Sequence, residues 1–85
     1  MKKNNNLIES YKKMANSLNL SFETITHQLR DGFMLLKEKD QIQVFEEISK
    51  RKEKFGTVTI NPVNDPDKNW AYELKGTLLI IKKTN

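Results

Sequence analysis

The chain contains no cysteine, and it has only three glycines and two prolines among its 85 residues. Without cysteine it can form neither a disulfide framework nor a thiolate zinc site. No stretch approaches the roughly 18 consecutive apolar residues of a membrane span, and the basic segment 1–6 is not followed by the apolar run of a signal peptide. These absences predict a cytoplasmic protein, in a bacterium or a host cell, that has no membrane contact.

Residue patterns typical of catalysis are missing as well. His27 is the single histidine, and no carboxylate or nucleophile lies at a recognisable spacing from it. The serines have no nucleophile-elbow context, and the glycines do not form a phosphate loop. A chain of this length forms one domain with little core to give up for a substrate cavity. We therefore predict a single domain, 1–85, with a disordered tail at 1–5, without enzymatic activity, cofactor or metal.

The charge balance favours a polyanionic partner. Fifteen lysines and arginines against eleven acidic residues give a net charge of +4. Excess positive charge raises affinity for nucleic acid through counterion release, although charge of this size also keeps small domains soluble. The abundance of Asn, Lys and Ile is typical of AT-rich coding sequences, which suggests a bacterium, a phage or a mobile element as the source.

Helical periodicity covers the first two thirds of the chain. Apolar residues at helical spacing predict a helix from about Asn6 to Leu18, and Asn19 follows as a residue that tolerates the left-handed conformation. A second helix is predicted from Phe22 to Glu38, with the alternative that Gly32 ends it. A third is predicted to begin near Asp40, with Gln43 completing a capping box, and to end at Gly56. The second prediction depends on the apolar positions Phe22, Ile25, Leu29, Phe33 and Leu36.

After Gly56 the period changes from 3.6 to 2, as in β-strands. Residues 57–60 and 70–74 alternate, residues 61–68 have the composition of a loop, and Lys75-Gly76 predicts a tight turn. The run from Leu78 to Ile81 is apolar at every position, which predicts a strand covered on both faces. The expected fold is therefore α+β, with three N-terminal helices followed by a three-stranded antiparallel β-meander.

The segment 14–29, MANSLNLSFETITHQL, resembles the helix-turn-helix of bacterial regulators such as the LuxR-type response regulators. Ala15 matches the small residue that lets the two helices approach, and Asn19 matches the left-handed turn position. Ser21 matches the cap of the second helix. The resemblance covers about a fifth of the chain, and the strands that follow would make the domain a winged-helix variant.

The resemblance implies a nucleic-acid-binding protein, with duplex DNA as the expected ligand. The helix from Phe22 would then enter the major groove, with Arg30 bonding guanine and Glu23 accepting from cytosine. The resemblance places four residues of this helix on its DNA-facing side: Glu23, Thr26, His27 and Arg30.

Two further features each allow two interpretations. The basic cluster could hold phosphates, or it could be a solvated helix end; its members are Lys50, Arg51, Lys52 and Lys54. Trp70 and Tyr72 could stack on single-stranded bases, but a pair at this spacing on a strand more often forms the floor of the core.

We predict a small regulatory or accessory protein that binds DNA. The alternative is a small inhibitor that binds a host protein, as anti-CRISPR proteins of phages block host nucleic-acid machinery. A third hypothesis is a homodimer formed through the strand Thr77–Lys83, which would apply if that strand lay at the edge of the sheet.

Overall fold

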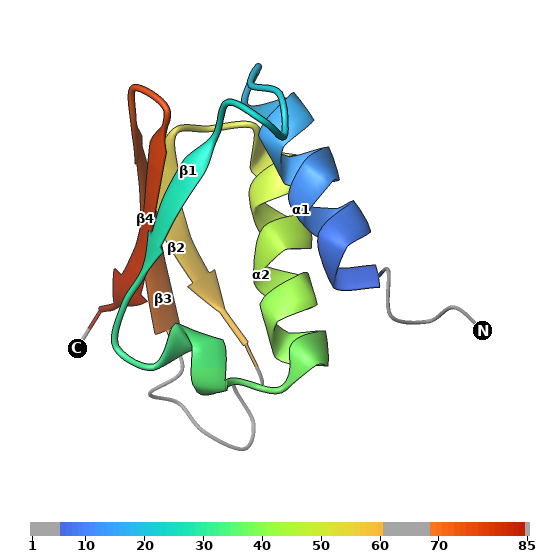
Figure 1. Ribbon diagram of the computed structural model, residues 1–85. Coiled ribbons are helices and arrows are strands. Elements are labelled where there is room, and N and C mark those ends of the chain that lie inside the picture. The colour runs from blue at the N-terminus through green and yellow to red at the C-terminus, as the bar shows by residue number, and fades with distance from the viewer. Residues whose placement is uncertain (1–5, 61–68, 85) are drawn as a thin grey trace.

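The computed structural model describes residues 6–60 and 69–84, and these form two layers. Two helices cover one face of a four-stranded sheet whose strand order is β1-β4-β3-β2 (Figure 1). The predicted arrangement of three helices and a three-stranded antiparallel meander, as in a winged helix, is therefore wrong. In chain order the elements are α1 (Asn6–Ser17), β1 (Thr26–Leu29), the 3-10 helix η2 (Phe33–Leu35), α2 (Glu38–Arg51), β2 (Phe55–Thr59), β3 (Asn69–Lys75) and β4 (Leu78–Lys83).

The first helix is confirmed. It buries Met14 and Ala15, and Leu18 just after it, in the core. Asn19 adopts the left-handed conformation that the sequence predicts, with φ at 67°. The N–H of Leu20 donates to the carbonyl of Ala15 at 3.0 Å, which closes the helix end.

The second predicted helix is wrong, because residues 22–37 contain a turn, a strand and a 3-10 helix, and Glu38 is the first residue of α2. Ser21 does act as a cap, since its Oγ accepts the Thr24 N–H at 3.2 Å, but only one turn follows. Asp31 and Gly32 have φ of 58° and 82°, so the chain changes direction where a helix would continue. The β-branched run from Thr24 to Thr26 favours a strand, and β4 supplies the ladder.

The third predicted helix exists as α2, but both of its ends differ from the prediction. Lys37 is the N-cap and makes no side-chain capping bond, so Asp40 lies inside the first turn. The helix ends at Arg51, because Lys52 takes the left-handed conformation with φ at 57°. Gly56 belongs to β2, where it pairs with Tyr72.

The sheet contains the predicted meander and one strand more. β2, β3 and β4 are antiparallel neighbours, and Gly76 forms the turn between β3 and β4 with φ at 63°. The added strand β1 runs parallel to β4, with Thr26 opposite Leu78 and Leu29 opposite Ile81. The strand Thr77–Lys83, which the dimer hypothesis required at an edge, therefore lies inside the sheet as β4, between β1 and β3. The predicted tail 1–5 and loop 61–68 lie outside the described residues.

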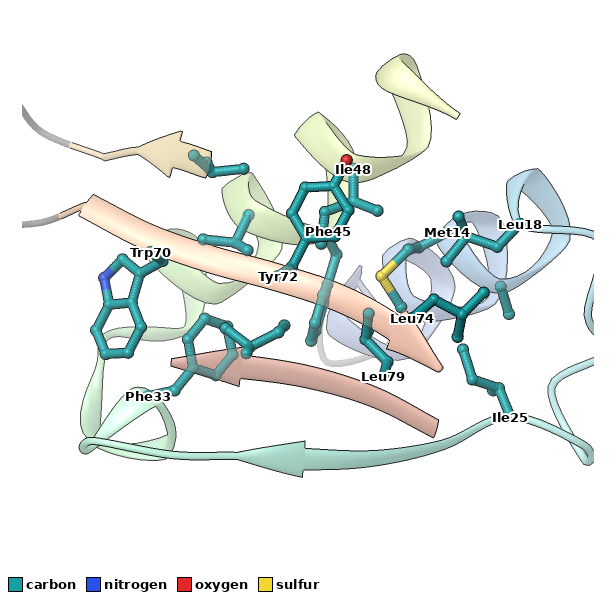
Figure 2. Packing of buried hydrophobic residues seen from close by; sticks show 14 of the residues in the cluster. Met14, Leu18, Ile25, Phe33, Phe45, Ile48, Trp70, Tyr72, Leu74 and Leu79 are labelled. Carbon is teal, nitrogen blue, oxygen red and sulfur yellow. The ribbon is translucent and has the colours of Figure 1, made fainter. Parts of the chain in front are cut away.

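The core fills the space between the helices and one face of the sheet. Figure 2 shows Trp70, Tyr72 and Leu74 of β3 directed toward the helix side, where Phe33 contacts Trp70 at a ring distance of 5.3 Å. Alternation along β4 buries Leu79 and Ile81 on this side and leaves Leu78 and Ile80 half-buried on the other. The prediction that this strand is covered on both faces is wrong, because both helices lie on the same side (Figure 1).

Candidate functional site

The residues predicted to face DNA do not share one surface. Glu23 lies in an exposed turn, Thr26 and His27 belong to β1, and Arg30 follows that strand directly. Successive strand residues point to opposite faces, so Thr26 and Arg30 lie on the side of the sheet away from the helices. His27 lies on the helix side. The major-groove helix that these residues were predicted to form is absent from the described segment 22–38.

His27 belongs to an aromatic cluster near α1. Its Nδ1 lies 2.9 Å from the Tyr11 hydroxyl, and the two rings meet edge to face at 5.4 Å. Tyr11 also packs against Phe22 and Phe45, at 5.7 Å and 5.3 Å between ring centroids. Burial raises the pKa of Tyr11 above its usual 10.0, so the hydroxyl keeps its proton over the physiological range.

The face of the sheet away from the helices, here called the outer sheet face, is built by all four strands. Along each strand, every second side chain points into the core, and the side chains between them form the outer sheet face. This face extends across the sheet from Thr26 on β1 to Thr59 on β2. This face contains a hollow of about 540 Å³. The outer sheet face comprises Thr26, Gln28, Arg30, Phe55, Thr57, Thr59, Asn69, Ala71, Glu73, Lys75, Leu78, Ile80 and Lys82.

The outer sheet face is basic. Arg30, Lys75 and Lys82 are exposed there, and Glu73 is the acidic residue among the described side chains of this face. The Arg30 guanidinium donates to Gln28 Oε1 at 2.8 Å, which holds it along β1. All four charged residues line the hollow, so a ligand there would meet an excess of positive charge.

Phe55 is the aromatic residue that the outer sheet face exposes. Its side chain is 70% accessible, and it lines the same hollow as Arg30. Sequence reasoning missed it because it was assigned to the last turn of a helix; its position at the start of an alternating segment was the available signal. Trp70 and Tyr72 are only 2% accessible, so the interpretation of this pair as core is confirmed.

The basic cluster of 50–54 joins α2 to the outer sheet face. Arg51 donates from a guanidinium nitrogen to the Thr57 carbonyl at 2.6 Å, which fixes it against β2. Lys50 lies 3.9 Å from Glu47 in an exposed ion pair, and Lys52 and Lys54 are exposed. The cluster therefore flanks Phe55 at the β2 edge, while Arg30 lies at the end of β1, the strand at the opposite edge of the sheet.

A second exposed surface lies on the opposite side of β1, between that strand and the helices. It is a groove of about 210 Å³ that is lined almost wholly by apolar atoms. Three large side chains on its rim are exposed: Ile8 by 48%, Phe22 by 42% and Met34 by 61%. This apolar groove is lined by Leu7, Ile8, Tyr11, Phe22, His27, Leu29, Met34, Gln41 and Phe45.

Neither surface contains a metal centre in the part of the chain that the structure describes. Within residues 6–60 and 69–84, no three His, Cys, Asp or Glu side chains gather closely enough to hold a metal ion. In these same ranges, no helix has the length and apolar character needed to cross a membrane.

Comparison with known proteins adds no assignment: no protein-family model, no curated protein and no solved structure matches this chain.

Proposed function

We propose that the chain binds nucleic acid through the outer sheet face and acts as a small regulatory or accessory protein. The observation that carries this proposal is the composition of that face. Arg30, Lys75 and Lys82 line the same hollow as the exposed ring of Phe55, and Glu73, the acidic residue of this lining, pairs with Phe55 across β2 and β3. Basic side chains neutralise phosphates and release counterions, and an exposed aromatic ring offers a stacking surface for a base.

Single-stranded nucleic acid suits this face better than a duplex. Duplex recognition in the major groove uses a protruding helix or ribbon, and residues 22–38 do not form one. A sheet with an exposed aromatic ring instead accepts unstacked bases, as in proteins that bind single strands. The basic cluster beside Phe55 extends the positively charged path past β2, where Arg51 is already held by the Thr57 carbonyl.

The test is fluorescence anisotropy with a labelled oligonucleotide of about 15 nucleotides, as single-stranded DNA, single-stranded RNA and duplex, across a salt series. Phe55→Ala removes the stacking surface and should weaken single-strand binding by roughly fivefold to a hundredfold, from about 1–3 kcal/mol per stacked base. Arg30→Gln with Lys82→Gln should lower the salt slope by about 0.7 for each phosphate that the variant no longer neutralises.

Lys13→Gln is the matched control, because Lys13 is exposed on α1, on the helix side of the sheet. It removes one positive charge, as Arg30→Gln alone does, from a surface that the proposal does not use, so it should change affinity little. If no oligonucleotide binds at low salt, or if Lys13→Gln weakens binding as much as Arg30→Gln does, the outer sheet face is not a nucleic-acid site.

The apolar groove favours a second candidate function, the binding of a host protein by a small inhibitor. Exposed apolar patches on small domains mark protein contacts. A pull-down from lysate, with and without nuclease, separates the two functions. A stoichiometric foreign partner that survives nuclease treatment would support inhibition, and a partner set that disappears with the nucleic acid would support the sheet-face proposal.

A further inference from the structure

The two edges of the sheet differ in whether the protein covers them. At β2 the Leu74 N–H donates to the Lys54 carbonyl, so the alternation of an antiparallel ladder turns the Thr57 carbonyl away from β3. Arg51 donates to that carbonyl at 2.6 Å. One side chain of the chain itself therefore covers part of the β2 edge.

Within residues 6–60 and 69–84, no side chain bonds to the outward backbone groups of β1 in the way that Arg51 bonds to β2. Thr26 and Arg30 donate their N–H groups to the carbonyls of Thr77 and Ile81, at 2.9 Å and 2.8 Å. Because alternate residues of a strand bond to opposite sides, the backbone groups of His27 and Leu29 face away from β4. β4 is the one neighbour of β1 in the described sheet, and the segment Thr26–Leu29 contains neither a proline nor a charged residue. Such an edge is a template for another strand.

The apolar groove lies directly beside this edge. His27 and Leu29 line it from the strand, and Phe22 and Met34 line it from the segments just before and just after the strand. A strand added to β1 would therefore direct alternate side chains over the groove and bury its exposed rim, which is how strand addition obtains affinity as well as backbone bonds.

We infer that the occupant of this edge is a second copy of the chain, paired antiparallel through β1 about a twofold axis at Gln28. In this register His27 of one copy faces Leu29 of the other, and the outward N–H and C=O groups of both residues pair. Gln28 faces Gln28, and Thr26 faces Arg30, so no charged side chain meets a like charge. A symmetric interface must be self-complementary in this way.

The groove satisfies the same symmetry. Phe22 precedes β1 and Met34 follows it, so antiparallel pairing brings the Phe22 end of one groove to the Met34 end of the other. A thioether against an aromatic ring is a favourable contact. The exposed apolar rims are thereby buried against each other, and two outer sheet faces become one continuous sheet surface. This inference stands independently of nucleic-acid binding.

Disulfide cross-linking tests the proposed pairing of the two β1 strands directly. Because the chain has no cysteine of its own, each variant carries a single thiol. Gln28→Cys places two thiols on opposed residues whose Cα atoms lie about 4.5 Å apart, a spacing that a disulfide accepts. Thr26→Cys is the matched control on the same strand and face, since the two copies of this position would lie about 14 Å apart. Under mild oxidation Gln28→Cys should form a covalent dimer rapidly, and Thr26→Cys should not.

Sedimentation over a concentration series tests the groove without a cross-link. Met34→Glu puts a charge into the proposed interface and should weaken the dimer by at least about tenfold, as expected for a well-packed interface side chain. Leu35→Glu is the matched control in the same 3-10 helix, because Leu35 is 89% exposed and does not line the groove. Circular dichroism checks that both variants fold.

Three results would overturn the inference: a monomer at every concentration up to the millimolar range, equal cross-linking at positions 26 and 28, or equal weakening by Met34→Glu and Leu35→Glu. A monomeric chain that still binds oligonucleotides would refute the dimer alone. A dimer that binds no nucleic acid would refute the sheet-face proposal alone.

Discussion

The two faces of the sheet are built from alternate residues of the same strands, yet only one of them packs against the helices. On the helix side Leu79 and Ile81 are fully buried and the aromatic rings of β3 pack against Phe33. On the outer side their neighbours Leu78 and Ile80 are half-buried among charged and hydroxyl side chains. Stability therefore resides mainly in one face, and the other is free to carry side chains selected for a partner.

The largest expected effect is a difference in the free energy of unfolding between two alanine variants of β4, one on each face of the sheet. Ile81→Ala removes a fully buried side chain and should lower the free energy of unfolding by about 2–5 kcal/mol. Ile80→Ala removes the same atoms from the outer sheet face, where the side chain keeps part of its contact with water, and should cost about 1 kcal/mol or less. Urea denaturation of the two variants measures the difference; equal losses would mean that the outer face is also covered.

A smaller effect concerns pH and the helix-side residue Tyr72. Burial raises its pKa above the usual 10.0, Arg51 opposes this increase, and Glu53 adds to it. The unfolded chain ionises this hydroxyl near pH 10.0 while the folded chain retains the proton. The stabilisation is therefore fully present below pH 10 and is lost as the pH rises through the folded-state pKa.

Tyr72→Phe keeps the ring in the core and removes the ionisation. The variant should lose stability less steeply than the natural chain above pH 10, as measured by urea denaturation at intervals from pH 8 to pH 11. Lysine titration contributes equally to both proteins and cancels in the comparison. Parallel curves for the two proteins would show that Tyr72 ionises equally in the folded and unfolded chains.

The smallest effect on stability should come from the outer face itself. Glu73→Gln removes the acidic charge beside the basic residues of that face and should change the free energy of unfolding by no more than about 0.5 kcal/mol. It should tighten oligonucleotide binding, because the local positive charge increases. Glu46→Gln removes the same charge from the exposed side of α2; if it tightens binding equally, net charge rather than the sheet face governs affinity.

Much of the fold follows from local patterns. The apolar stripe of α1, the left-handed Asn19, the alternation of β3 and the turn at Gly76 were all predictable, because each depends on contacts between residues close in sequence. The same reasoning failed for 22–38. There the apolar positions fit a helical period, but Ile25, Leu29 and Phe33 reach the core from a turn, a strand and a 3-10 helix.

The candidate site was predicted only in part. Arg30 was a candidate because of the helix-turn-helix resemblance, and the basic cluster was a candidate because of its charge; Arg30 lies on the outer sheet face, and the cluster lies beside it. Phe55 was missed, because its exposure depends on where α2 ends, and that end is set by the left-handed Lys52. Glu23 and His27 were included because of the supposed helix, and the strand separates His27 from the others by turning it to the opposite face.

The sequence alone determined that this chain is a small, basic, cysteine-free domain with a helix near its start and antiparallel strands in its last third, since composition and short-range periodicity need no knowledge of distant contacts. Tertiary structure decided the rest. β1 is a strand because it forms a parallel hydrogen-bonded pair with β4, about fifty residues later. A pairing at that separation produces no periodic pattern in the residues of β1 that sequence analysis could detect. The bare edge and the apolar groove beside it follow from that pairing, whereas the outer sheet face is open because both helices pack on the other side of the sheet (Figure 1).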